Sequence, residues 1–394
     1  MNYRKSMKKV QLSRTSPEQK ALLQALASDD LNVRLPAYTA MAEFITQVAQ
    51  KVIEQAETLT NWYVALPFDA NQSQTIPLDA LFDLEGEEGQ QYIRIWSQTQ
   101  AGNLATNVPH ANQEVPFQTY PLNSAISFDE RHLREGRVDW ASKALNRALA
   151  GFLNERTRMA SENWLGTLAQ AEGDLAGTPL PNVIRGEFED EFRITDLNRL
   201  WTLMSRLNTS WYGGTPASVL GAMGGITDIA MSPKRVEDIR NMAFNPLNNK
   251  GTGDIEGTEN LRNSIYNTAG IPGLYGVNIV QFNELDVVGP KRWASIFETA
   301  ANGKTFEGSA FDKDNEELIL AVDASRETAY RPYETNAASG LDEEIRVRPD
   351  NQFFNREEKV GFYMGSRQGN IIVDTRGMAG LIIGEKAEEP SSGT

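Results

Sequence analysis

The chain has 394 residues, enough for two or three domains, and it carries a formal net charge of −15 with no cysteine. The missing thiols exclude disulfides, thiolate metal sites and cysteine nucleophiles, and with only His110 and His132 a multi-histidine zinc site is nearly excluded. The acidic balance argues against a dedicated DNA-binding protein. No apolar run reaches the roughly 18 residues of a membrane-spanning helix, so we expect a soluble product of the cytoplasm.

The N-terminus is the basic part of this acidic chain. Residues 1–20 hold six basic residues against Glu18 alone, and they lack the apolar stretch of a signal peptide. The basic residues are Arg4, Lys5, Lys8, Lys9, Arg14 and Lys20. We expect residues 1–15 to form a polar arm that is mobile in isolation.

Two helices are predicted after this arm. Ser16-Pro17-Glu18-Gln19 reads as a capping box that opens the first helix, and Asp29-Asp30 end it. The second helix is expected to follow Pro36, because apolar residues recur there at steps of three and four. Its predicted apolar face consists of Met41, Phe44, Ile45, Val48, Val52 and Leu59.

Between residues 60 and 128 the sequence changes to prolines and short strand-like runs, for example 63–66, 92–96 and 115–120. The segment contains seven carboxylates, and its only Lys or Arg is Arg94. Those carboxylates belong to Asp69, Asp79, Asp83, Glu85, Glu87, Glu88 and Glu114. The pattern predicts a long two-stranded excursion, and such a ribbon needs a surface to lie on because it is marginal alone.

A single long amphipathic helix is predicted over 137–171, about 50 Å in length. Ser127 and Glu130 fit a capping box at its start, and Gly173 follows its last turn. Gly136 lies within the span that this cap would open, so the helix either begins after that glycine or bends there. Its apolar stripe places Leu145 and Phe152 on the packed face and Lys143 on the flank. So long a helix is typical of a strut, although a core helix of an ordinary enzyme domain gives the same pattern.

The remaining chain alternates helices and short strands. We expect a helix over 197–207, a buried strand over 227–231, and a helix that Ser232-Pro233 opens and that runs through Met242. Further strands are predicted at 276–282, 317–322, 344–347, 360–364, 370–374 and 381–383. The last residues, 385–394, form a polar tail.

Candidate catalytic chemistry is sparse. Asn302-Gly303-Lys304-Thr305 looks like the end of a phosphate-binding loop, but Glu298 stands where that motif needs glycine, and a turn explains the tetrapeptide better. The acids over 312–317 lack the spacing of a calcium loop and are interpreted as a solvated charge run. No G-x-S-x-G motif occurs. The sequence therefore predicts a protein that is not an enzyme and holds no metal or cofactor.

Four segments, in this order, resemble the major capsid protein of tailed bacteriophages, the Hong Kong 97-type fold. They are Ile76-Pro77-Leu78-Asp79-Ala80-Leu81, the strand–Ser–Pro–helix unit over 227–241, Val360-Gly361-Phe362-Tyr363-Met364, and residues 371–377. The resemblance covers roughly residues 37–384. It implies an α+β fold with an N-terminal arm, an extended β-hairpin loop, a long spine helix in a peripheral domain, and a mixed axial domain.

The resemblance also implies domain boundaries. Residues 1–60 would be the arm, 61–127 the extended loop, 128–193 the peripheral domain with the spine helix, 194–330 the axial domain, 331–385 strands returning to the peripheral domain, and 386–394 the tail. Only about 36 residues precede the matching region, so the scaffold is expected to be a separate chain.

The function implied is a virion structural protein, assembled in the host cytoplasm. Its hexamers and pentamers would tile an icosahedral shell around packaged double-stranded DNA, which the shell contacts without sequence specificity. Expected partners are further copies of itself and separate scaffold, portal and decoration proteins, with no membrane. An encapsulin-like compartment shell with enzyme cargo, and a soluble α+β enzyme, remain as alternatives.

Assembly contacts are expected in two places. The basic arm is expected to meet either an acidic surface of another subunit or the DNA, through Arg4, Lys5, Lys8 and Lys9. The extended loop is expected to lie over a neighbouring subunit with Leu81, Phe82, Ile93 and Trp96 as apolar anchors. No lysine occurs between Lys51 and Lys143, so the loop lacks the amine nucleophile by which some members of the resembled family link their subunits covalently.

Overall fold

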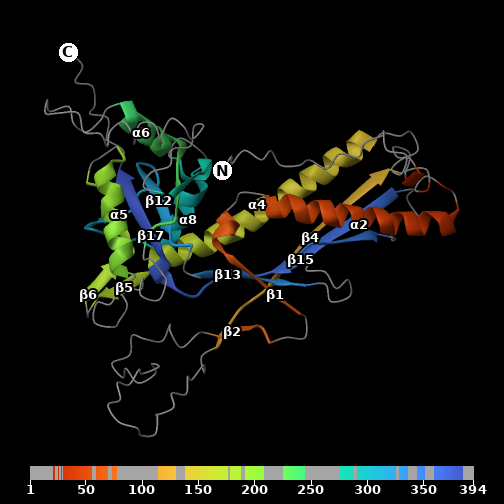
Figure 1. Cartoon of the computed structure of the whole chain (residues 1–394), viewed down its shortest axis with the longest axis horizontal. Coiled ribbons are helices and arrows are strands. Elements are labelled where there is room, and N and C mark those ends of the chain that lie inside the picture. The colour runs from red at the N-terminus through yellow and green to blue at the C-terminus, as the bar shows by residue number, and fades with distance from the viewer. Residues whose placement is uncertain are drawn as a thin grey trace, which may run out of the picture. The chain divides into compact units, whose positions relative to one another are not determined.

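The computed structural model describes most of the chain outside its ends and several connecting segments (Figure 1). The described residues are 21–22, 25, 28, 30–55, 59–69, 73–77, 114–129, 138–175, 178–187, 191–207, 225–244, 276–286, 291–324, 328–335, 344–350 and 359–384. They form an α+β fold that divides into two compact units. Unit 1 comprises Met1–Ile76, Pro116–Ala160 and Tyr330–Ile371, and unit 2 comprises Pro77–Val115, Ser161–Ala329 and Ile372–Thr394.

In unit 1, helix α2 spans Leu31–Gln55. Asp30 caps it, because its Oδ1 accepts the backbone N–H of Asn32 at 3.0 Å and its carbonyl accepts that of Arg34 at 3.0 Å. The sequence analysis was wrong to start this helix after Pro36, which lies inside it. The missing N–H of a proline removes one intrahelical bond, and the helix continues because one face is buried. That face includes Ala37, Tyr38, Met41, Ala42, Ile45 and Ala49.

Helix α4 spans Val138–Gln170 and therefore begins after Gly136. The predicted cap at Ser127 is wrong, because Ser127 lies in strand β4, Tyr120–Asp129, opposite Gly361. An uninterrupted ladder between β4 and β15, Lys359–Gln368, uses the backbone that the cap would have needed. The helix contributes Leu149, Phe152 and Leu153 to the core of unit 1.

Unit 1 is built on a six-stranded sheet in which β15 is the central strand. It pairs antiparallel with β4 along one edge, with β14, Arg346–Asp350, along the other, and with β13, Ala329–Glu334, near its end. Strand β1, Val64–Phe68, runs parallel to β13, which also pairs with β16, Ile371–Ile372. One face of this sheet packs against α2 and α4 through Leu122, Val347, Phe362 and Met364.

Strands β2, Thr75–Pro77, and β3, Glu114–Pro116, form a separate two-stranded sheet. A small core of Phe68, Ile76 and Phe117 lies beside it, and the short 3-10 helix η1 spans Leu59–Trp62. Strand β1 and most of β4, which fall inside the loop predicted over 61–127, belong to the six-stranded sheet instead. The rest of the predicted loop, 78–113, lies outside the described residues.

Unit 2 contains a five-stranded sheet in the order β7-β17-β12-β8-β9. The strands span Val183–Arg185, Met378–Gly384, Glu316–Val322, Asp228–Met231 and Asn278–Gln281 in that order. Helices α5, Ile194–Leu207, and α6, Pro233–Phe244, contribute to its apolar core. These elements confirm the predicted helix at 197–207 and the strand–Ser–Pro–helix unit. Helix α8, Arg292–Ala301, was not predicted.

The structure divides the predicted return segment 331–385 between the two units. Strands β13, β14 and β15 belong to the sheet of unit 1, whereas β17 pairs with β12 over Glu316–Val322 in unit 2. The sequence analysis placed all of these strands together because short strand patterns do not show which strand is the partner.

Short hairpins and turns complete unit 2. Strands β5, Glu172–Leu175, and β6, Thr178–Pro181, form one hairpin, and β10, Thr305–Phe306, and β11, Ser309–Ala310, form another. Two 3-10 helices span Asn283–Leu285 and Thr375–Gly377. Asn302 ends α8 with a φ of 47°, and Gly303 follows with a φ of 79°, so 302–305 is a turn as predicted. None of the described helices is long and apolar enough to cross a membrane.

Candidate functional site: an arginine pocket on the six-stranded sheet

The residues predicted to make assembly contacts lie outside the described part of the chain. They are Arg4, Lys5, Lys8, Lys9, Leu81, Phe82, Ile93 and Trp96. His110 and His132 are outside it as well. The structure therefore does not place these residues.

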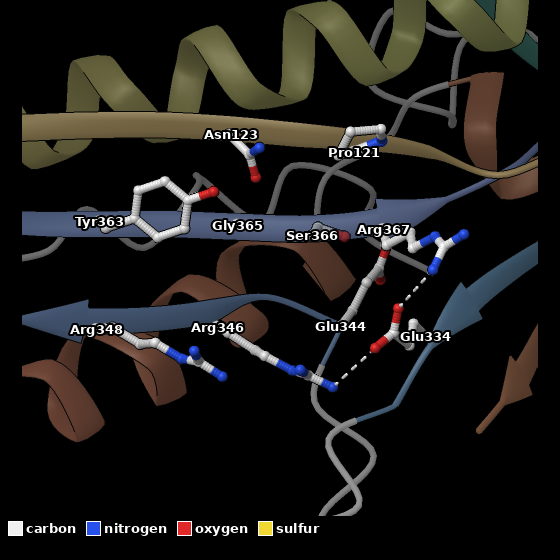
Figure 2. A pocket seen from close by; sticks show the side chains of 10 residues that line it. All are labelled: Pro121, Asn123, Glu334, Glu344, Arg346, Arg348, Tyr363, Gly365, Ser366 and Arg367. Atoms are coloured by element: carbon white, nitrogen blue, oxygen red, sulfur yellow. Dashed lines mark ion pairs between the residues drawn. The ribbon is translucent and has the colours of Figure 1, made fainter. Parts of the chain in front are cut away.

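A pocket of about 190 Å³ lies in unit 1 on the face of the sheet opposite the apolar core (Figure 2). Strands β4, β13, β14 and β15, together with Glu344 just before β14, supply its lining. The lining residues are Pro121, Asn123, Glu334, Glu344, Arg346, Arg348, Tyr363, Gly365, Ser366 and Arg367. Three of its side chains are arginines, so the pocket is a basic feature on a strongly acidic chain.

Strand register explains why these residues meet. Arg346 stands opposite Gly365, and Gly365 stands opposite Asn123, so the three form one row across β14, β15 and β4. In the next row Arg348 stands opposite Tyr363. Because side chains alternate along a strand, residues two apart share a face, and Val347 between the two arginines is buried in the core. A Cβ at Gly365 would lie 3.0 Å from Oδ1 of Asn123 and 3.2 Å from Cε1 of Tyr363, so these two side chains lie close over the glycine.

Glu334 holds two of the arginines in place. Its carboxylate lies 3.5 Å from Nη2 of Arg346 and 3.6 Å from Nη1 of Arg367. Arg346 also donates from Nη2 to the carbonyl of Thr335 at 2.6 Å, and Arg367 donates from Nε to Oγ1 of Thr119 at 2.9 Å. These bonds fix the two guanidinium groups beside the pocket.

Arg348 differs from the other two arginines. It is exposed, and its side chain has no ion-pair or hydrogen-bond partner among the described residues. It points along the same sheet face as Arg346 in Figure 2. The pocket therefore offers one cation with which no carboxylate of the described residues pairs.

A buried charge cluster adjoins the pocket at Glu344. This carboxylate is 2.9 Å from Nη1 of Arg156 on α4 and also pairs with Arg331 on β13, and all three residues are buried. Burial, and next the nearby charge of Arg331, lower the pKa of Arg156 to about 10, while Glu344 acts in the opposite direction. Among the described residues, one carboxylate thus pairs with two buried guanidinium groups.

The chemistry available here is oxyanion binding. Three arginines (Arg346, Arg348 and Arg367) and two carboxylates (Glu334 and Glu344) line the pocket, and Glu344 also pairs with the buried Arg156 and Arg331. Arginine presents a planar fork of N–H donors that matches a carboxylate or phosphate. Within the described part of the chain, no group of three or more metal-ligating side chains was found.

Unit 2 contains a second buried ionic cluster, and it corrects the sequence analysis. Glu317, interpreted there as part of a solvated charge run, is fully buried and pairs with Arg235 at 2.6 Å. The error arose because Glu317 lies in the central strand β12, which is covered on both faces, so that even a charged side chain at this position is buried. Asp314 remains largely exposed, and exposed Asp312 accepts backbone and side-chain N–H groups from Asp314 and Asn315.

Comparison with known proteins gives a likeness of fold only. No protein-family model matches the chain, and no curated protein matches it. Among solved structures, the capsid of Cyanophage P-SCSP1u is similar at 9% identity and a TM-score of 0.44, covering 84% of this chain and 89% of that one. The holo-SrpI encapsulin complex from Synechococcus elongatus PCC 7942 gives 11%, a TM-score of 0.43, and coverages of 84% and 90%.

The procapsid of satellite phage P4, which includes the size determination protein, is similar at 11% identity with a TM-score of 0.40. That match covers 91% of this chain and 99% of the other.

Proposed function

We propose that the chain is a shell-forming structural protein, the major capsid protein of a tailed bacteriophage with the Hong Kong 97-type fold. Its copies would assemble into hexamers and pentamers of an icosahedral shell that encloses double-stranded DNA. In this proposal the protein belongs to the virion, is assembled in the host cytoplasm, and works with separate scaffold, portal and decoration proteins.

The observation that carries the proposal is the order of elements along the chain. An N-terminal helix, a β-strand pair that brackets residues 78–113, the unbroken α4, the β8–Ser232–Pro233–α6 unit and a final set of strands follow in the order that the resemblance implies. A soluble enzyme gives no reason for this order.

The proposed domains follow the two units. Unit 1, with α2, most of α4 and the six-stranded sheet, would be the peripheral domain together with the N-terminal arm. Unit 2, with the five-stranded sheet and helices α5, α6 and α8, would be the axial domain. Residues 78–113 would be the extended loop.

The contents of the particles test the proposal and separate it from an encapsulin-like shell. Purified particles should be treated with nuclease on the outside, opened, and assayed for protected nucleic acid and for co-purifying protein. A phage head predicts protected double-stranded DNA of uniform length. Particles that hold a second protein and no DNA would instead identify a compartment shell, and material without particles would contradict both.

A further inference from the structure

We propose that the Asn302–Gly303 turn of unit 2 is a site of spontaneous chemical modification, at which the asparagine is converted to aspartate or isoaspartate. The pair lies between helix α8 and strand β10, and it is the only Asn-Gly pair in the sequence. The inference goes beyond the proposed function and does not depend on it, because the reaction needs only this side chain, the backbone that follows it, and water.

The reaction begins at the backbone nitrogen of Gly303. Once deprotonated, this nitrogen attacks Cγ of Asn302, a new C–N bond closes a succinimide ring, and the side-chain nitrogen leaves as ammonia. One water molecule then opens the ring. Attack on the side-chain carbonyl breaks the new C–N bond and gives aspartate, whereas attack on the backbone carbonyl breaks the original peptide bond and gives isoaspartate. Because the ammonia escapes, converted chains accumulate with time.

The structure leaves the attacking nitrogen accessible. Gly303 is exposed, and a Cβ added to it would meet no atom within 4 Å, so the space beside its backbone is open. Its N–H makes no hydrogen bond to the described residues. By contrast, the N–H groups of Asn302 and Lys304 on either side bond to backbone carbonyls at 3.2 and 2.9 Å. The glycine nitrogen is thus the one in this turn that is free to react.

The amide of Asn302 is equally available. The residue is exposed, and its side chain has no hydrogen-bond partner in the described part of the chain. Its backbone is left-handed, with a φ of 47° and a ψ of 42°, a conformation that costs free energy in any residue other than glycine. Ring closure requires rotation about ψ, which breaks the bond from Lys304 to the carbonyl of Ala301. The reaction therefore proceeds through local opening of the turn.

Conversion should weaken the connection between α8 and β10. Phe306 is buried and stacks on Phe297 of α8, with ring centroids 5.5 Å apart, and Lys304 pairs with Glu172 at 2.8 Å. Isoaspartate adds a methylene to the backbone between these contacts. A carboxylate at the C-terminal end of a helix also opposes the helix dipole. We therefore expect unit 2 to become less stable as converted chains accumulate.

Mass spectrometric peptide mapping of the folded full chain tests the site. The chain is incubated in isotopically labelled water at mildly acidic and at mildly alkaline pH, where more of the nitrogen is deprotonated. The peptide that contains Asn302 should change from amide to acid and carry the label, faster at the alkaline pH. Because the turn must open, conversion should be about fivefold or more slower than in a denatured sample.

Asn278 is the internal control for this experiment. It is also exposed, but its amide donates to Asp228 at 2.7 Å and the bulky Ile279 follows it, so it should stay unmodified in the folded chain. Equal labelling of Asn278 and Asn302 would overturn the proposal. So would a folded chain that keeps Asn302 intact over the time in which the denatured sample is fully converted.

Thermal unfolding tests the consequence for unit 2. Asn302→Gly is the matched variant, because glycine adopts the left-handed conformation without strain and carries no amide to convert. After the alkaline incubation, the midpoint of the wild-type chain should fall by about 2 °C or more, and that of Asn302→Gly should stay at its starting value. An equal fall in both proteins, or isoaspartate at position 302 with an unchanged midpoint, would contradict the weakening of the turn.

Discussion

Arg235 donates from Nε to Oε2 of Glu317 at 2.6 Å, and both side chains are fully buried. The hydroxyl of Ser232 donates to the same oxygen at 2.9 Å, and Nη1 of Arg235 donates to Asp238 at 3.0 Å. Arg235 lies on α6 and Glu317 on the central strand β12, so this pair fastens the helix to the sheet of unit 2.

Removing one charge of this pair should cost a large share of the stability of unit 2. Glu317→Gln keeps the volume but leaves Arg235 without its principal counter-ion, and we expect the free energy of unfolding to fall by about 3 kcal/mol or more. Asp314→Asn is the control, because its partner Lys291 is 3.0 Å away and Asp314 is 63% exposed. That change should cost less than about 1 kcal/mol in a urea titration. Equal urea midpoints for Glu317→Gln and Asp314→Asn would refute the assignment of Glu317 and Arg235 as a buried, stabilising ion pair.

Two glycines should respond oppositely to the same substitution. A Cβ at Gly369 would lie 2.4 Å from the backbone oxygen of Gln118, so Gly369→Ala requires the backbone to move and should destabilise unit 1. A Cβ at Gly151, inside α4, meets nothing within 4 Å. Gly151→Ala should therefore raise the free energy of unfolding by about 1 kcal/mol. Thermal unfolding midpoints check both signs, and a Gly369→Ala protein as stable as the wild type would show that the close approach is absent.

Phe152 tests the packed face of α4. It is 7% exposed in the core of unit 1, so Phe152→Asp buries an unpaired carboxylate at a cost of several kcal/mol. We expect no soluble folded protein. Lys143→Ala, on the exposed side of the same helix, should fold normally. A soluble Phe152→Asp protein with the helical circular dichroism of the wild type would show that the face was assigned wrongly.

Tyr120 should make unit 1 sensitive to alkali. Burial raises its pKa from 10.0 to about 12, and Asn370 donates to its oxygen at 2.7 Å. The folded state favours the neutral phenol, so the stability that this preference provides is complete below pH 10 and is lost as the pH rises through 12. The stability difference between the wild type and Tyr120→Phe should shrink over that interval. Both proteins keep Arg156, so the comparison isolates the phenol; a constant difference would contradict the raised pKa.

The sequence predicted the individual helices and strands better than it predicted which distant segments contact one another. The period of apolar residues placed α4, α5 and β8 correctly, because burial on one face determines those patterns. It could not show that β17 joins β12, nor that Glu317 faces a buried arginine, because both depend on contacts between distant segments. The cap at Ser127 failed because the ladder between β4 and β15 outweighs a single local hydrogen bond.

The arginine pocket was missed although one signal for it was present. Arg346 and Arg348 alternate with the apolar Val347, which is the pattern of a strand with one basic face. The third arginine of the pocket, Arg367, comes from β15, which is adjacent only in the folded sheet. Sequence spacing alone therefore gave the basic strand face but not the pocket.

Electron microscopy of the purified full-length chain tests the central claim most directly. Self-assembly predicts closed particles of uniform diameter whose class averages show icosahedral symmetry, with hexamers and pentamers as the capsomers. Size-exclusion chromatography of the same sample should place the protein in the void volume. A homogeneous small oligomer in both measurements, at concentrations and salt conditions where the chain is folded, would contradict the account.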